Sequence, residues 1–76
     1  MSDVTSEVRT LTDNIYYARK ENDATLAAQT LIALVPTFTQ GDKEFVLKNM
    51  NYCLSDKQQW KQRIASTVIV AVRHYA

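Results

Sequence analysis

Turn-forming residues are scarce in this chain. Gly41 is the only glycine and Pro36 the only proline among 76 residues. An all-β fold needs many tight turns and draws on these residues to make them, so the composition argues against one. Because 46% of the residues are hydrophobic and 22% are charged, the chain also differs from a disordered one. We therefore expect a folded, all-α protein.

Reactive side chains are equally scarce. Cys53 is the only cysteine and His74 the only histidine. One cysteine excludes an intramolecular disulfide, and one Cys with one His is too few for structural zinc, which takes about four such ligands. A single glycine excludes a glycine-rich loop that cradles phosphate. We expect no enzyme, no metal and no cofactor, with Cys53 buried as a small apolar residue and His74 as a charge at a helix end.

Neither the charge nor the apolar runs indicate a membrane or a strongly charged partner. A net charge of +1 creates no field over the whole molecule that would attract nucleic acid or an anionic membrane. The longest apolar run, Val68–Val72, has five residues, whereas a membrane-spanning helix needs roughly 20. The N-terminal residues lack the basic start and apolar run of a signal peptide. We expect a single cytoplasmic domain over residues 1–76.

Apolar spacing predicts four helices joined by short connections. In the first, Val4, Val8, Leu11, Ile15 and Ala18 recur at intervals of four, three, four and three residues, which forms one apolar stripe on a helix. The predicted helices cover residues 3–20, 24–35, 42–54 and 56–75.

Polar residues mark the expected helix ends. Asn22 or Asp23 is expected to cap the second helix, which stops before Pro36 because the residue before a proline is disfavoured in the α region. Ser55, followed three residues later by Gln58, fits a capping box for the last helix. Four acidic residues are explained without catalysis by the positive ends of helix dipoles. They are Asp3, Glu7, Asp42 and Glu44.

The run Val68–Val72 is compatible with two structures. Its β-branched residues suit a strand, yet no second strand-like segment is present to pair with it, so we expect a helix. A helix that is apolar on every side is buried on every side. Either its own domain covers it completely, or its domain covers one half and a partner covers the other. The predicted fold is a compact four-helix array with antiparallel neighbours, in which the C-terminal helix is the most buried. The predicted core is Val8, Leu11, Ile15, Leu26, Leu31, Leu34, Phe45, Met50, Trp60, Ile64 and Val68.

Aromatic and apolar residues provide the candidate binding surface. Tyr16 and Tyr17 lie 100° and 200° around a helix from Ile15, so they cannot both face one core. Tyrosine is enriched in protein interfaces. Phe38, in the loop of residues 36–41, either folds onto the core or anchors a partner. The candidate partner-binding residues are Tyr16, Tyr17, Phe38, Val70, Val72 and Tyr75.

Basic residues on the last helix provide an alternative. Lys57 and Lys61 lie one turn apart, with Arg63 nearby and Arg73 further along. Such a row can follow a nucleic-acid backbone, although the intervening glutamines dilute the charge.

The surplus of apolar and aromatic residues over what a thin core can hide favours a non-catalytic protein that binds another protein or copies of itself. The alternative is a small nucleic-acid-binding module, or a modulator of a DNA-bound protein. In size and style the chain is similar to many small accessory proteins of bacteria and bacteriophages that inhibit or redirect a host machine. That likeness implies an inhibitor or regulator and assigns a role to no residue.

Overall fold

Four α-helices make up the part of the chain that the computed structural model describes, residues 4–75. They are α1 (Thr5–Tyr16), α2 (Glu21–Leu34), α3 (Gln40–Cys53) and α4 (Gln59–His74), with a short 3₁₀ helix, η1 (Val35–Thr37), directly after α2. These residues hold no strand. The predicted all-α, four-helix class is confirmed. The run Val68–Val72 lies within α4, so a strand there is ruled out.

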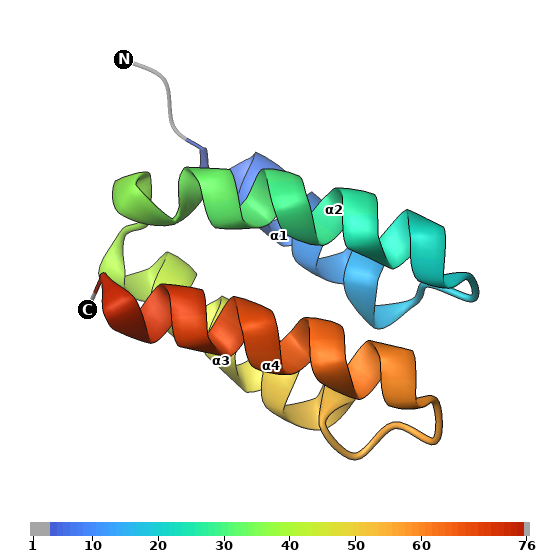
Figure 1. The fold of residues 1–76 in the computed structure, drawn as a ribbon. Coiled ribbons are helices and arrows are strands. Elements are labelled where there is room, and N and C mark those ends of the chain that lie inside the picture. The colour runs from blue at the N-terminus through green and yellow to red at the C-terminus, as the bar shows by residue number, and fades with distance from the viewer. Residues whose placement is uncertain (1–3, 76) are drawn as a thin grey trace.

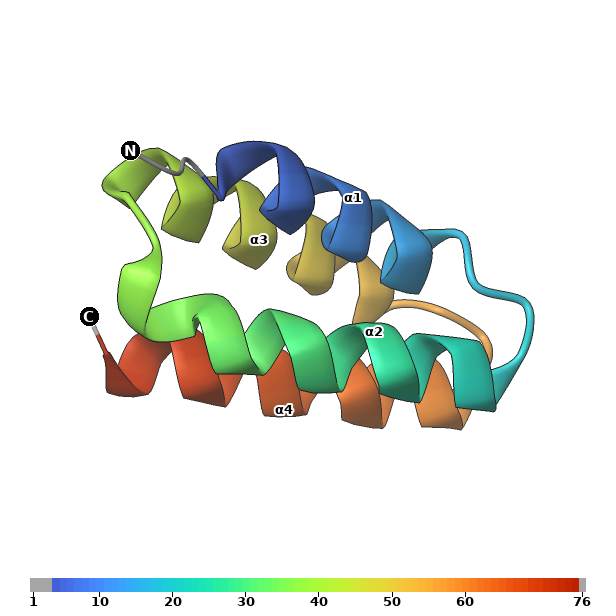
Figure 2. The same ribbon diagram turned by 90° about the horizontal axis from the view of Figure 1, so that it is seen from above.

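The helices form two hairpins stacked in two layers. In Figure 1, α1 and α2 run in opposite directions, and so do α3 and α4. Figure 2 shows the same bundle from above, with α2 over α4 and α1 beside α3. Helix α1 packs against α2 and α3, and α4 packs against the same two helices. Sequential neighbours are therefore antiparallel, whereas the pairs between the layers, α1 with α3 and α2 with α4, run parallel.

Helix α1 is shorter at its end than predicted. It ends at Tyr16 rather than at residue 20. The Nζ of Lys61, in α4, donates a hydrogen bond to the Tyr16 carbonyl oxygen at 2.9 Å. Carbonyls in the last turn have no partner within their own helix, and a cation there also interacts favourably with the helix dipole. This end therefore depends on a residue distant in sequence. The predicted start at Asp3 lies outside the described residues.

Two predicted caps are wrong. Helix α2 begins at Glu21 after an extended Lys20, so neither Asn22 nor Asp23 is its N-cap. Helix α4 begins at Gln59, and Gln58 makes no side-chain cap. The Asp56 Oδ1 instead accepts a hydrogen bond from the Gln58 backbone N–H at 2.9 Å, so the predicted Ser55 capping box does not form.

A capping box does form at the start of α3. The Asp42 backbone N–H donates to Thr39 Oγ1 at 3.1 Å, and the Thr39 N–H donates to Asp42 Oδ2 at 3.0 Å. Two N–H groups at the helix start are thereby satisfied reciprocally. Asp42, an acidic residue that the sequence predicts at this helix start, is buried there, and Thr39 satisfies both its backbone N–H and its carboxylate.

The predicted core residues are buried or half-buried in all four helices, with one exception in α2. Leu26 is 57% exposed. It lies 200° around the helix from the fully buried Ala24, and α2 packs inward through small residues instead. Predicted core residues that are buried are Val8, Ile15, Leu31, Met50 and Val68. Those that are half-buried are Leu11, Leu34, Phe45, Trp60 and Ile64.

Candidate protein-binding surface

The two reactive side chains lie at opposite ends of the bundle. Cys53 ends α3, close to the turn into α4, whereas His74 ends α4. The length of α4, about 24 Å at 1.5 Å per residue, separates them. Within residues 4–75, no group of three or more His, Cys, Asp or Glu side chains is placed to hold a metal ion. Burial raises the pKa of the Cys53 thiol, which keeps it protonated and weakly nucleophilic at neutral pH.

The prediction that the two tyrosines at the end of α1 cannot both face the core is confirmed. Tyr17 is 73% exposed, while Tyr16 is half-buried and packed against the core. Their rings meet edge to face, with centroids 4.9 Å apart. Tyr16 therefore supports the orientation of Tyr17, which presents its ring to solvent.

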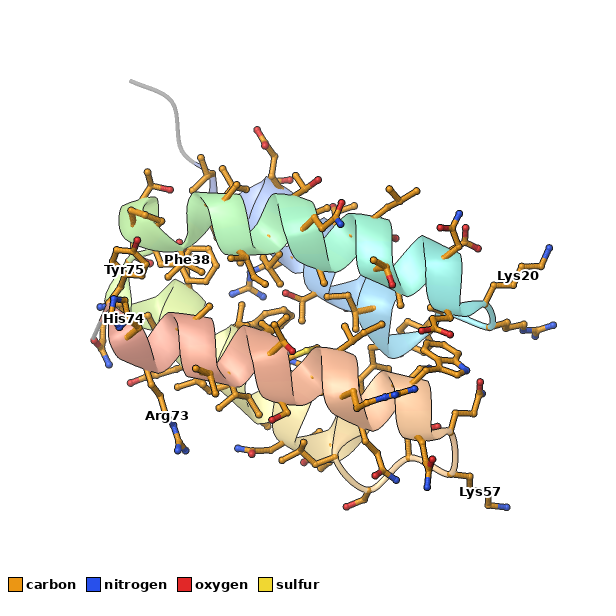
Figure 3. All side chains as sticks on the ribbon, in the orientation of Figure 1. Lys20, Phe38, Lys57, Arg73, His74 and Tyr75 are labelled. Carbon is orange, nitrogen blue, oxygen red and sulfur yellow. The ribbon has the colours of Figure 1, made fainter. Side chains whose placement is uncertain are left out.

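Phe38 and Val72 are not on the surface. Phe38 folds onto the core, and Val72 is 1% exposed. Phe38 follows η1, whose turn directs its side chain inward between the two layers (Figure 3). Val72 lies on the same face of α4 as Val68 and Ala65, both fully buried. Neither side chain is available as a surface contact. The prediction for Val72 is therefore wrong, and of the two alternatives for Phe38 the structure shows the one in the core.

Val70 and Tyr75 are exposed, as a binding role requires, but they lie apart from Tyr17. Val70 is 64% exposed on α4. Tyr75 follows α4 at the opposite end of the bundle from Lys20 (Figure 3). Its ring contacts that of His74 edge to face, with centroids 5.2 Å apart. The six candidate residues therefore form no single surface.

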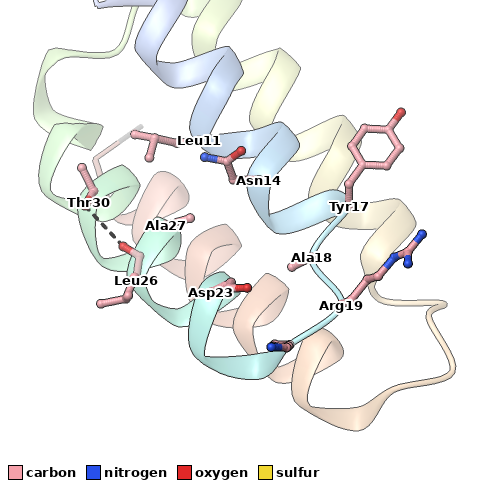
Figure 4. Close-up of a pocket in the computed structure, with 10 residues that line it drawn as sticks. Leu11, Asn14, Tyr17, Ala18, Arg19, Asp23, Leu26, Ala27 and Thr30 are labelled. Carbon is pink, nitrogen blue, oxygen red and sulfur yellow. Dashed lines mark hydrogen bonds between the residues drawn. The ribbon is translucent and has the colours of Figure 1, made fainter.

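A groove between α1 and α2 contains Tyr17 and exposed residues of α2. Its volume is about 750 Å³, and Figure 4 shows Tyr17 and Leu26 on its two sides. A smaller hollow of about 260 Å³ shares Leu11 and Thr30 with it and extends it toward Glu7. We call these two together the α1/α2 groove. Its lining is Ser6, Glu7, Thr10, Leu11, Asn14, Tyr17, Ala18, Arg19, Lys20, Asp23, Leu26, Ala27 and Thr30.

The solvent side of α2 carries no charge after its first turn. Residues 24–41 contain no Asp, Glu, Lys or Arg, and Leu26, Gln29, Thr30 and Ala33 are exposed. A second hollow, of about 230 Å³, lies on the other side of this helix against α4. Apolar spacing does not reveal the groove, because it predicts Leu26 in the core. The long uncharged run is the sequence signal that could have revealed it.

The predicted basic row loses its central member. Lys61 is 4% exposed, because its amine is bound to the Tyr16 carbonyl and lies 4.0 Å from Asp56 Oδ2. Its ammonium also lies 5.5 Å from the centre of the Trp60 ring. Lys61 is therefore a structural residue and is not available to a phosphate. Lys57, Arg63 and Arg73 are exposed.

Comparison with models of protein families, with curated proteins and with solved structures finds no match to this chain. None of the described helices combines the length and apolarity needed to cross a bilayer. The functional argument therefore rests on the chain's own surface.

Proposed function

We propose that this chain is a non-catalytic binding protein that attaches to protein through the α1/α2 groove. The observation that carries the proposal is the exposure of Tyr17 (73%) and Leu26 (57%) on the two sides of that groove. Large apolar side chains beside a hollow are what interface cores use, and aromatic residues dominate binding energy at such sites. Where the bound protein is a larger one, occupying its surface would make the chain an inhibitor or regulator.

The groove has the mixed character of an interface rather than that of a small-molecule site. Its walls are apolar at Leu11 and Ala27, and polar at Asn14 and Thr30. It is a shallow, open hollow along two helices, whereas pockets for small ligands bury most of the ligand surface. A helix or another extended apolar ridge would fit between α1 and α2, as ridges pack into grooves elsewhere in helical proteins.

Site-specific photo-cross-linking in the cells that naturally produce the chain tests this proposal. A photoreactive phenylalanine analogue at position 17 should give a protein adduct, while the same analogue at Val70 provides a control of similar exposure on another helix. Mass spectrometry then identifies the adduct as a second copy or a foreign protein. Equal labelling at the two positions, or none at position 17, would contradict the proposal.

A second candidate function is nucleic-acid binding, favoured by the charge on the second hairpin. Lys61, Lys43, Asp42 and Asp56 of this hairpin make hydrogen bonds within the chain. Besides His74, its exposed charged residues are Glu44 and four basic residues. In Figure 3, Lys57 and Arg73 both project on the side away from α2. The basic residues are Lys48, Lys57, Arg63 and Arg73.

Fluorescence anisotropy with a labelled DNA duplex tests this candidate. If four of these cations contact phosphates, affinity should fall about 100-fold between 50 and 200 mM salt, since each contact releases close to one counterion. The double variant Lys57→Gln/Arg73→Gln should weaken binding. The variant Arg19→Gln/Lys20→Gln removes the same charge from the first hairpin and should not. Equal losses in both variants, or no binding at low salt, would reject the candidate.

A further inference from the structure

We infer that the α1/α2 groove is occupied by the same groove of a second copy, in an antiparallel dimer with twofold symmetry. This inference rests on the proposed function and specifies its partner. A twofold interface places the same surface of each chain against the other, so the surface must complement itself. Three features of the groove are relevant to this requirement: the spacing of its residues, its charges and its size.

The spacing of the lining residues along α1 is symmetrical. Glu7, Leu11 and Asn14 on α1, and Ala18 just beyond its end, line the groove at intervals of four, three and four residues. A twofold axis across the middle of this series puts Leu11 of one copy opposite Asn14 of the other. The same axis brings Glu7 opposite Ala18 of the second copy.

The residues of α2 that line the groove are also spaced symmetrically. Asp23, Leu26, Ala27 and Thr30 line it at intervals of three, one and three residues. An axis between Leu26 and Ala27 therefore brings the Leu26 side chains of the two copies together at the centre. This contact would cover the exposed leucine that the core does not use, and Tyr17 would pack over Leu11 of the other copy.

The charges at the ends of the groove are complementary in this arrangement. Glu7 lies at one end, and Arg19 and Lys20 lie at the other. Within residues 4–75, none of the three makes an ion pair in its own chain. Reversing one copy places its Glu7 beside Arg19 and Lys20 of the second copy, twice in the dimer. Asp23 shares the basic end, where it also lies in the first turn of α2 and favours the positive end of that helix dipole.

The size of the face agrees with a stable dimer. The Cα extents of the bundle are 38 × 20 × 16 Å, so its largest face measures 38 by 20 Å. A standard protein interface covers about 800 Å² on each partner. A face of these dimensions is comparable to that area only when contact extends along the full length of α1 and α2.

Sedimentation equilibrium over a dilution series, with variants at the centre and at the ends, tests the dimer. The unmodified chain should sediment as two chains. Leu26→Asp places two carboxylates at the axis and should raise the dissociation constant at least 100-fold, whereas Val70→Asp adds the same charge to α4 and should leave it within twofold. Circular dichroism checks that each variant is folded.

Charge reversal then tests the antiparallel register. Glu7→Lys should weaken the dimer about tenfold, and so should Arg19→Glu/Lys20→Glu, because each places like charges together. Combining all three substitutions restores opposite charges and should recover most of the affinity. Glu44→Lys, on α3, is the matched control and should have no effect.

Two results would overturn the inference. One is a single-chain mass at every concentration. The other is a two-chain species insensitive to Leu26→Asp, which would assign the contact to another face. Neither result decides whether position 17 cross-links to a foreign protein in cells, so failure of the dimer and failure of the proposed function remain distinguishable.

Discussion

The Lys61 ammonium donates a hydrogen bond to the Tyr16 carbonyl oxygen and so connects the start of α4 to the end of α1, across 45 positions of sequence. The Lys61 side chain is 6% exposed, and Asp56 lies 4.0 Å away. Burial of a charge is costly unless hydrogen bonds and an opposite charge accompany it. Lys61 has both, and the two layers of the bundle are joined through it.

Replacing Lys61 should therefore destabilise the fold. Lys61→Met keeps the length of the side chain but removes the donor, leaving the Tyr16 carbonyl unpaired, at a cost of about 1–3 kcal/mol in the free energy of unfolding. Urea denaturation followed by circular dichroism measures it. Lys57→Met, at an exposed position, should stay within about 0.5 kcal/mol. Similar losses in both variants would mean that the buried bond contributes nothing.

The capping box of α3 should have a measurable contribution. Thr39→Ala removes the acceptor for the Asp42 N–H and should lower the free energy of unfolding by about 0.5–2 kcal/mol. Thr10→Ala, at an exposed position within α1, provides the comparison and should cost less, because alanine is the better helix former. The thermal unfolding midpoints of the two variants report the difference. A Thr39 variant as stable as the unmodified chain would contradict the role of the cap.

Truncation to alanine should destabilise the fold at Leu31 but not at Leu26. Leu31 is fully buried, so Leu31→Ala should cost about 2–5 kcal/mol. Leu26→Ala should leave the stability of the single chain within about 0.5 kcal/mol, because Leu26 is exposed. Chemical denaturation at a concentration where the chain is a monomer measures both. A large loss at Leu26 would show that it contributes to the core after all.

Cys53 should make stability depend on pH in the alkaline range. Burial raises the pKa of its thiol in the folded state, so the unfolded chain loses the proton first as pH rises. Stability is then unaffected below the ordinary thiol pKa of about 8.5, and it falls as pH rises above that value. The difference in unfolding free energy between the unmodified chain and Cys53→Ala, followed from pH 7 to 10, isolates this effect. A constant difference would contradict it.

The periodic parts of the fold were predictable from sequence. Val8, Ile15 and Val68 lie where their spacing placed them, because an amphipathic stripe is a local property that any packed helix must bury. The four helices followed from the same reasoning, and so did the expectation that Tyr16 and Tyr17 cannot both face the core. What local spacing could not supply was the choice of inward residues in α2, where Ala24, Ala27 and Ala28 allow close packing and displace Leu26 outward.

The candidate surface was less predictable, because the packing of the helices and of η1 decides which of its residues are buried. From its neighbours in sequence, Lys61 is expected to be a solvent-exposed lysine. It is buried because its ammonium binds the Tyr16 carbonyl of another helix. Phe38 was compatible with either side of the loop until η1 directed it inward. The groove itself is a product of how α1 and α2 pack, so its residues share no motif.

The first turn of α1 and the last turn of α4 lie at the same end of the bundle, and the turn joining α1 to α2 lies at the other (Figure 1). A short peptide could therefore connect residue 5 to residue 75 and allow the chain to be reopened elsewhere. Opening it in the residues between α3 and α4 would leave α1 and α2 continuous. Such a circular permutant would present the same groove on a chain whose helices follow one another in a different order. Its behaviour would show whether the surface acts independently of the order in which the helices are synthesised.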